Sequence, residues 1–242
     1  MEVLQLSPIE EAITRNALIK RGRLGNGFYP NDSWPMMNSD TRDDGTSGFY
    51  SYAARFENVF PSELGINTFE SWTDCFERIN DRRPIALELM GNAHLLSRLG
   101  LPGVFVNWTP DYEEGSYWFD DHRVEINHDI ENIPSFLPAL TSALYQFAED
   151  GKVDLIVWKG EGGLSSMLHK AEAFEYWWTL LIGLLRNGGS AFIQNPYYMR
   201  DGCNISGTLE RFEGLMYTSG MANIIHDTPE GSRNTYIRID RF

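Results

Sequence analysis

Residues 153–158 read Val-Asp-Leu-Ile-Val-Trp, and residues 184–193 read Leu-Leu-Arg-Asn-Gly-Gly-Ser-Ala-Phe-Ile. The first stretch has the length and composition of a buried strand. The segment between them carries large apolar residues at helical spacing, namely Phe174, Trp177, Trp178 and Leu181. The Asn-Gly-Gly at 187–189 is typical of the end of a helix. A strand, a helix and a second strand in this order predict two parallel neighbours in a sheet covered by helices.

The same alternation extends on both sides of this unit. We expect further strands at 84–89, 103–107 and 123–127, with a helix after the first and the third. Toward the C-terminus we expect strands at 215–219 and 234–240, joined through 227–231 as an antiparallel hairpin. The predicted fold is therefore α/β: a seven-stranded, mostly parallel sheet with helices on both faces and an antiparallel C-terminal hairpin strand.

The N-terminal third is different in character. We predict a helical and irregular cap over residues 1–83, followed by the α/β domain over residues 84–242. Ser7-Pro8-Ile9-Glu10 has the pattern of a capping box with proline at the first helical position. A second helix is indicated by four apolar residues at helical spacing: Phe69, Trp72, Phe76 and Ile79. The aromatic loop from Phe28 to Met37 is expected to act as a lid over the site.

Composition excludes several classes of protein. The chain has 20 Lys and Arg against 34 Asp and Glu, a formal net charge of -14, which argues against nucleic acid as a partner. No segment approaches the roughly 18 uncharged apolar residues of a membrane span, and the first residues, Met1-Glu2-Val3-Leu4, lack the basic and then apolar profile of a signal peptide. Two cysteines, Cys75 and Cys203, are too few for a disulfide framework, and the five histidines lack the spacing of metal ligands. These features predict a cytoplasmic, metal-free globular protein.

Polar residues follow the apolar runs, where a parallel sheet places its ligands. They are Glu88, Asn107 and Asp129, with Trp158 and Lys159 at the end of a fourth run. A phosphate site would require a glycine-rich loop and basic residues, but no G-x-G-x-x-G follows the first strand and no G-x-x-x-x-G-K-[ST] occurs in the chain. Carboxylates and amides suit hydroxyl groups, an amine and the edge of an adenine ring. The sequence therefore favours a ligand that carries such groups.

The order of these segments resembles the class I S-adenosylmethionine-dependent methyltransferases, which have a Rossmann-like fold. The resemblance spans about residues 84–242 and is clearest at 153–158 and 184–193. It implies that S-adenosylmethionine is the cofactor and that methyl transfer to a small molecule or a protein is the reaction. The cofactor-binding residues that it implies are Glu88, Met90, Gly91, Asn92, Asn107, Asp129, Ile130 and Trp158.

Each of these residues has an implied role. Glu88 and the turn at 90–92 would lie alongside the methionine part of the cofactor, and Asn107 would bind the ribose hydroxyls. Asp129 would contact the adenine amine while Ile130 packs on the ring, and the strand ending at Trp158 would lie beside the transferred methyl group. No catalytic residue is assigned, since placing the acceptor in line with an electrophilic methyl supplies most of the rate.

Alternative interpretations remain open for the same residues. Met90, His94 and Asn107 depart from the family pattern, which favours a methyltransferase-fold scaffold that has lost the cofactor. The alternative roles are a charge at a helix N-terminus for Glu88, an N-cap for Asp129 and a core or pocket-wall position for Trp158. Asn195-Pro196-Tyr197-Tyr198 is similar to the Asn-Pro-Pro-Tyr motif of amino-methyltransferases, but it follows the fifth strand instead of the fourth.

Overall fold

The computed structural model describes residues 7–10, 56–89, 94–107, 115–159, 171–196, 205–230 and 234–242. Its strands are β1 (Ala86–Leu89), β2 (Gly103–Asn107), β3 (Gly115–Asp120), β4 (Arg123–Asn127), β5 (Val153–Lys159), β6 (Leu185–Pro196), β7 (Ala222–Asp227) and β8 (Asn234–Arg241). Its helices are η2 (Ser62–Leu64), α4 (Phe69–Asn80), α5 (His94–Leu99), α6 (Ile133–Leu144), α7 (Ala171–Leu184) and α8 (Ser206–Thr218).

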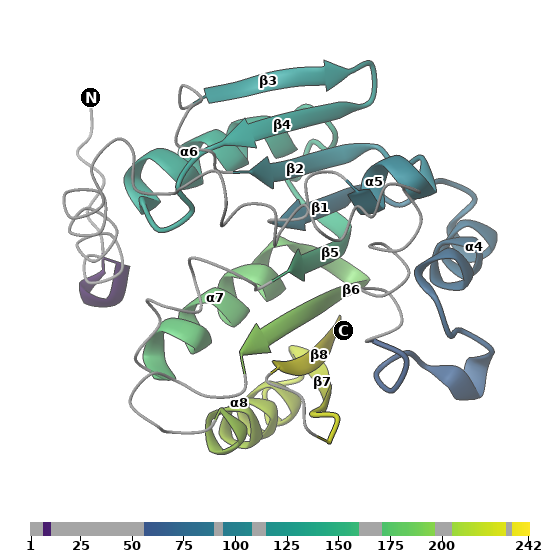
Figure 1. The fold of residues 1–242 in the computed structure, drawn as a ribbon, viewed down its shortest axis with the longest axis vertical. Helices are drawn as coiled ribbons and strands as arrows, with labels where there is room; N and C mark the ends of the chain where they lie inside the picture. Colours follow the sequence, from purple (N-terminus) through teal and green to yellow (C-terminus); the bar gives the residue numbers. More distant parts are fainter. Residues whose placement is uncertain are drawn as a thin grey trace.

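All eight described strands form one sheet in the order β3-β4-β2-β1-β5-β6-β8-β7 (Figure 1). The strands from β4 to β6 pair in parallel, whereas β8 lies antiparallel between β6 and β7. The chain moves outward from β1 to β2 and β4, and then continues on the other side through β5 and β6. This strand order confirms the predicted Rossmann-like α/β fold with its antiparallel C-terminal hairpin.

The predicted count of seven strands was wrong because β3 adds an eighth at the edge. It pairs antiparallel with β4, with a register shift between Trp118 and Asp120. Its four central residues are all exposed. A strand with neither face buried has no alternation of apolar and polar residues, so the periodicity of the sequence could not reveal it.

The predicted strand at 215–219 was also wrong, since these residues end helix α8 and the strand begins later, at Ala222. Leu209, Phe212 and Met216 pack on the core from one side of α8. Their separations of three and four residues are those of a helix. Leu215 lies on the other side of the helix and is exposed.

Helices cover both faces of the sheet (Figure 1). One apolar cluster joins α6, α7 and α8 to the strands, and a second joins α4, α5 and residues 56–66 to the opposite face. Phe192 of β6 is central to the second cluster, since the rings of Phe56, Phe60 and Phe69 lie 4.8–5.8 Å from it. The described part of the N-terminal region therefore packs directly on the sheet.

Helix α4 confirms the helix predicted before Asn80. Thr68 and Ser71 form a capping box at its start, and Asp81 ends it with a φ of 51°. The three aromatic residues expected on its apolar face, Phe69, Trp72 and Phe76, are buried. Ile79, which shares their spacing, is 76% exposed, because it lies in the last turn of the helix beyond the sheet-facing contacts.

Two glycines allow the parallel strands to start close together. A Cβ on Gly103, whose φ is 151°, would lie 1.9 Å from the carbonyl oxygen of Ala86 in β1. A Cβ on Gly189 in β6 would lie 2.8 Å from the carbonyl oxygen of Asp154 in β5. Only glycine fits such close backbone approaches. The Asn-Gly-Gly sequence therefore serves the pairing of β5 with β6, in addition to following helix α7.

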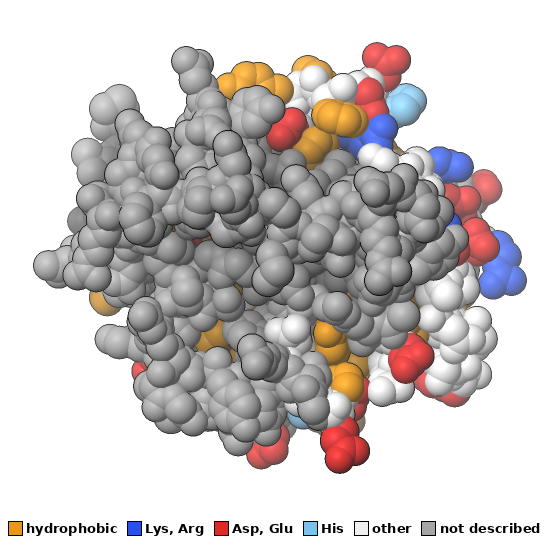
Figure 2. All heavy atoms as spheres, in the orientation of Figure 1, with side chains coloured by type: hydrophobic (Ala, Val, Ile, Leu, Met, Phe, Trp, Pro, Cys, Tyr) orange, Lys and Arg blue, Asp and Glu red, His pale blue; other side chains and the backbone are white. Residues whose placement is uncertain are grey.

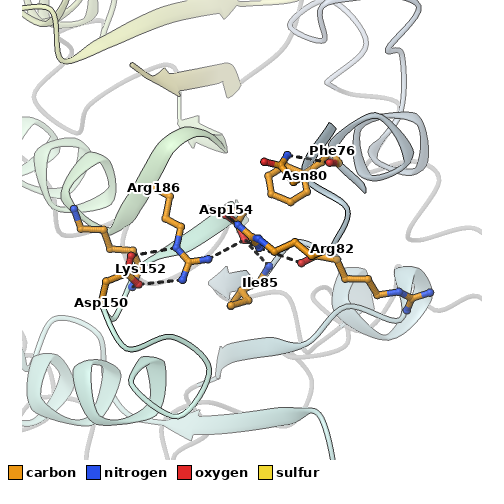
Figure 3. Close-up of polar contacts among 9 residues, drawn as sticks. Phe76, Asn80, Arg82, Ile85, Asp150, Lys152, Asp154 and Arg186 are labelled. Carbon is orange, nitrogen blue, oxygen red and sulfur yellow. Dashed lines mark hydrogen bonds and ion pairs between the residues drawn. The ribbon is translucent and has the colours of Figure 1, made fainter. Parts of the chain in front are cut away.

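A buried carboxylate at the start of β5 ties three segments together (Figure 3). Asp154 is 1% exposed and accepts two hydrogen bonds of 2.7 Å from the guanidinium of Arg82. It also accepts a 2.9 Å bond from the backbone N–H of Ile85, just before β1. Arg186 of β6 lies 3.5 Å away and pairs mainly with Asp150. The starts of β1, β5 and β6 are thus held by one charge network.

We predict that Asp154→Asn lowers the free energy of unfolding by about 3 kcal/mol, because it removes a buried charge partner of two arginines. The matched variant Asp150→Asn should cost less than about 1 kcal/mol, because its carboxylate is 48% exposed and screened by water. Urea denaturation of both variants and the wild type measures the difference. Equal losses for the two variants would contradict the assigned role of Asp154.

The contribution of Asp150 to stability should depend on pH. The hydrogen bonds from Arg186, aided by the backbone N–H of Lys152, lower the pKa of Asp150 from 3.8 to about 2. A carboxyl group with a lowered folded-state pKa stabilises the fold above its unfolded pKa. The difference between wild type and Asp150→Asn should therefore be fully present above pH 3.8 and fade as the pH falls toward about 2. Denaturation curves between these pH values test this, and a difference that persists at the acid end would refute it.

Candidate functional site

The strand register brings the predicted site segments to one edge of the sheet. Leu89 of β1 lies opposite Val106 of β2 on one side and Trp158 of β5 on the other. Asn107 of β2 lies opposite Asn127 of β4. Because these four strands are parallel, the residues that follow them emerge side by side, which is where open α/β sheets bind ligands.

Glu88 lies near the end of β1 and is 3% exposed. Its Oε2 accepts hydrogen bonds of 3.1 Å from the backbone N–H groups of both Leu95 and Leu96 in α5. A carboxylate at a helix N-terminus satisfies N–H groups that have no partner within the helix. Glu88 therefore connects the end of β1 to the start of α5, and the predicted site residues Met90, Gly91 and Asn92 lie between these two elements in the sequence. Those three residues lie outside the described part of the chain.

Asp129 and Ile130 follow β4 and precede helix α6. The Oδ1 atom of Asp129 accepts a 3.1 Å hydrogen bond from the backbone N–H of Glu131. The N-cap of α6 is Asn132, so Asp129 fixes the turn before the helix and is not its N-cap. Ile130 is 4% exposed and belongs to the apolar cluster on the α6 face.

Trp158 near the end of β5 is buried in the same apolar cluster. Its ring makes an edge-to-face contact with Trp177 of α7, with centroids 5.8 Å apart. Within the described residues its indole N–H has no hydrogen-bond partner. The structure therefore places Trp158 and Ile130 below the strand ends on one face of the sheet, whereas Glu88 faces α5 on the other.

Several buried polar residues at this edge were not predicted as site residues. They are Asn127, His128, Glu131, Gln194 and Asn195. His128, one of the five histidines without metal-ligand spacing, is 8% exposed beside the end of β4. Each of the five follows an isoleucine within one or two residues in the sequence. A polar residue directly after an apolar run was the signal that could have found them.

The N-terminal capping box is present and contacts this side of the molecule. The backbone N–H of Ser7 donates to Oε2 of Glu10 over 2.6 Å, and the Tyr176 hydroxyl of α7 donates to Oε1 over 3.0 Å. Burial, followed by the bond to Glu10, raises the pKa of Tyr176. Burial of Glu10 tends to raise its pKa, but the hydrogen bonds from Ser7 and Tyr176 outweigh this effect and lower the pKa of Glu10. Figure 1 shows this segment in purple on the side toward which β1, β2 and β4 point.

The predicted lid and one motif cannot be placed. The aromatic loop from Phe28 to Met37 lies outside the described residues, as do Tyr197 and Tyr198. The side chain of Asn195 is buried at the end of β6, and its Nδ2 has no hydrogen-bond partner among the described residues. The described ranges contain no cluster of three or more His, Cys, Asp or Glu residues suited to a metal ion. Nor do they contain a helix long and apolar enough to cross a membrane.

No protein-family model and no curated protein matches this chain. Among solved structures, the chain is similar to the plantazolicin methyltransferase BpumL in complex with S-adenosylhomocysteine, with 12% identity, 97% and 99% of the two chains covered, and a TM-score of 0.46. It is also similar to a protein described as a ribosomal RNA methyltransferase from Plasmodium falciparum, with 14% identity, 70% and 94% coverage, and a TM-score of 0.45. A third is the Methanococcus jannaschii fibrillarin pre-rRNA processing protein, with 11% identity, 65% and 66% coverage, and a TM-score of 0.40.

The strand order of the chain, and not these distant likenesses, defines its fold. Two of the three matched proteins are named for ribosomal RNA. The net charge of this chain, in contrast, argues against a nucleic-acid partner. Those names describe the matched proteins alone.

Removing the Glu88 carboxylate should weaken the hydrogen bonding at the start of α5. In Glu88→Ala the amide hydrogens of Leu95 and Leu96 lose their acceptor, so we expect their exchange with solvent to accelerate on the order of tenfold. The matched variant Asp74→Ala removes an exposed carboxylate from α4 and should leave both amides unchanged. Hydrogen–deuterium exchange measured by NMR or mass spectrometry gives the answer. Unchanged protection in Glu88→Ala would show that α5 does not depend on this carboxylate.

Proposed function

We propose that the protein binds S-adenosylmethionine at the carboxyl edge of β1, β2, β4 and β5 and transfers its methyl group to a small-molecule or protein acceptor. The observation that carries this proposal is the strand order, which reverses direction at β1. In open α/β sheets the neighbouring loops diverge at such a reversal and leave a crevice that binds the ligand. The segment resemblance to class I methyltransferases spans the same four strands.

The donor set at this edge fits the groups of the cofactor. S-Adenosylmethionine carries an amine, a carboxylate, two ribose hydroxyls and an adenine ring. Glu88 in β1 provides a carboxylate, while Asn127 at the end of β4 and Asp129 two residues later provide an amide and a second carboxylate. A site of this kind is better suited to hydroxyl and amine groups than to phosphates.

Each side chain has a distinct role in the proposal. Glu88 joins the end of β1 to the start of α5. Residues 90–93, which lie between these elements in the sequence, would contact the methionine part of the ligand. Asn107 would bind the ribose hydroxyls and Asp129 the adenine amine, while Ile130 and Trp158 provide apolar walls. The bound cofactor supplies an electrophilic methyl group. Catalysis would then depend mainly on holding the acceptor in line with that methyl and excluding water.

A second function is favoured by a specific observation. Ile130 and Trp158 pack within the apolar cluster, and the Oε2 atom of Glu88 binds α5. These contacts are compatible with a scaffold that keeps the methyltransferase fold without the cofactor. Asn107 in place of an acid points in the same direction.

Calorimetric titration with S-adenosylmethionine and S-adenosylhomocysteine distinguishes the two functions. The enzyme hypothesis predicts saturable binding of both in the micromolar range. Asp129→Ala should weaken it about tenfold, because a hydrogen bond to a charged group contributes on the order of 1.5–3 kcal/mol. Asp74→Ala on α4 is the control and should bind as the wild type does.

Thermal unfolding of every variant is measured in parallel, so that loss of binding is not confused with loss of fold. Absence of binding by a folded wild-type protein would refute cofactor binding and leave the scaffold as the function. Binding that Asp129→Ala does not weaken would place the ligand elsewhere.

A further inference from the structure

Strand β3 forms one edge of the sheet (Figure 1). It exposes three consecutive aromatic residues. Tyr117 is 48% exposed, Trp118 58% and Phe119 55%. In the part of the chain that the structure describes, β4 pairs with the inner side of β3 and no strand pairs with the outer side. The outer side of a sheet edge presents a row of backbone N–H and C=O groups that can pair with another strand.

The aromatic side chains of β3 are held in place from the inner side. The Phe119 ring makes an edge-to-face contact with Phe105 of β2 at 5.2 Å, and the guanidinium of Arg123 lies 5.3 Å from its centre. On the opposite face, the Trp118 ring lies 5.8 Å from Phe147, just beyond α6. Side chains that are already ordered lose little conformational entropy when a partner binds them.

The strand has few of the features by which natural edges avoid pairing. Protected edges usually carry lysine or proline or present unpaired charges. Residues 115–120 include neither lysine nor proline, and their one charged residue, Asp120, is ion-paired with Arg123. A register shift between Trp118 and Asp120 disturbs only the end of the strand. The regular part of the edge, up to Trp118, is thus suited to accept a further strand.

The charge around β3 selects the partner. Residues 111–125 contain six acidic residues and one arginine. A second copy of the chain would bring two acidic sequences of this kind together. Like charges directly opposite one another destabilise strand pairing. Charge complementarity therefore favours a basic strand over a second copy.

We propose that the outer edge of β3 binds an extended, basic polypeptide segment as an added antiparallel or parallel strand. Backbone hydrogen bonds to β3 supply affinity that is independent of sequence, and the aromatic side chains contact alternate residues of the added strand. Acidic residues on either side attract its lysines or arginines. Figure 2 shows hydrophobic side chains at the top of the molecule, over β3, with acidic side chains beside them. This surface is independent of the proposed cofactor site.

The test uses a fluorescent heptapeptide of alternating lysine and valine, titrated with the full-length protein and followed by anisotropy. Two further probes keep the same side chains but carry N-methyl groups on alternate backbone amides, the odd ones in one peptide and the even ones in the other. An added strand has only one edge bonded to β3. We therefore expect one N-methylated probe to lose binding and the other to bind as the unmodified peptide does.

Matched variants locate the surface. Trp118→Ser should weaken binding of the unmodified probe about tenfold, as expected for loss of a central aromatic contact. Tyr217→Ser removes another exposed aromatic residue, from α8, and should have no effect. Both positions lie on the surface, and unfolding curves confirm that each variant is folded.

Three results would overturn the proposal. Equal binding of both N-methylated probes would mean that only the charge of the peptide is recognised. No binding of the unmodified probe would show that the edge does not accept a basic strand. A dimer in analytical ultracentrifugation that Trp118→Ser dissociates would assign the edge to a second copy of the chain.

Discussion

The buried carboxylate of Asp154 is the constraint on which the arrangement of the central strands depends. Asp154 is the second residue of β5. Its carboxylate accepts hydrogen bonds from Arg82 and from the backbone N–H of Ile85, directly before β1. Arg186 then links the same network to the start of β6 and to Asp150. A carboxylate removed from water stabilises a fold only when its partners satisfy it fully, and here two guanidinium groups and a backbone amide do so. Because β1, β5 and β6 are adjacent, fixing their starts also fixes where their carboxyl ends emerge.

The two ends of the sheet are therefore organised differently. At the amino ends, opposite charges are paired and glycines allow close backbone contact. At the carboxyl ends, buried carboxylate, amide and imidazole groups collect, among them Glu88, Asn127 and His128. Glu88 connects this edge to α5 in the way that Asp154 connects the other edge to Arg82. A rigid sheet with polar groups at one edge is the arrangement that a pre-organised ligand site requires.

The two lateral edges of the sheet also differ. Strand β7 is joined to β8 in a hairpin and is packed against α8. Arg241 at the end of β8 donates hydrogen bonds of 2.8 and 2.6 Å to the carbonyl oxygens of Ile182 and Leu185, which closes the C-terminal end of α7. Strand β3 on the other side has its aromatic residues exposed. Of the two described edges, β3 is thus the one that exposes a row of aromatic side chains.

The sequence by itself determined the parallel core. Its buried strands are continuous apolar runs, its helices have apolar residues at three- and four-residue spacing, and turn residues separate them, so each is a local signal. For the same reason it located the polar residues after the strands, including Glu88 and Asp129. It could not determine β3, whose residues face water on both sides, nor the contact of Glu88 with α5. Only the tertiary structure decided that Ile130 and Trp158 face the α6 side and that Asp154 joins three strand starts. These facts depend on which distant segments become neighbours, and no local pattern of residues records that.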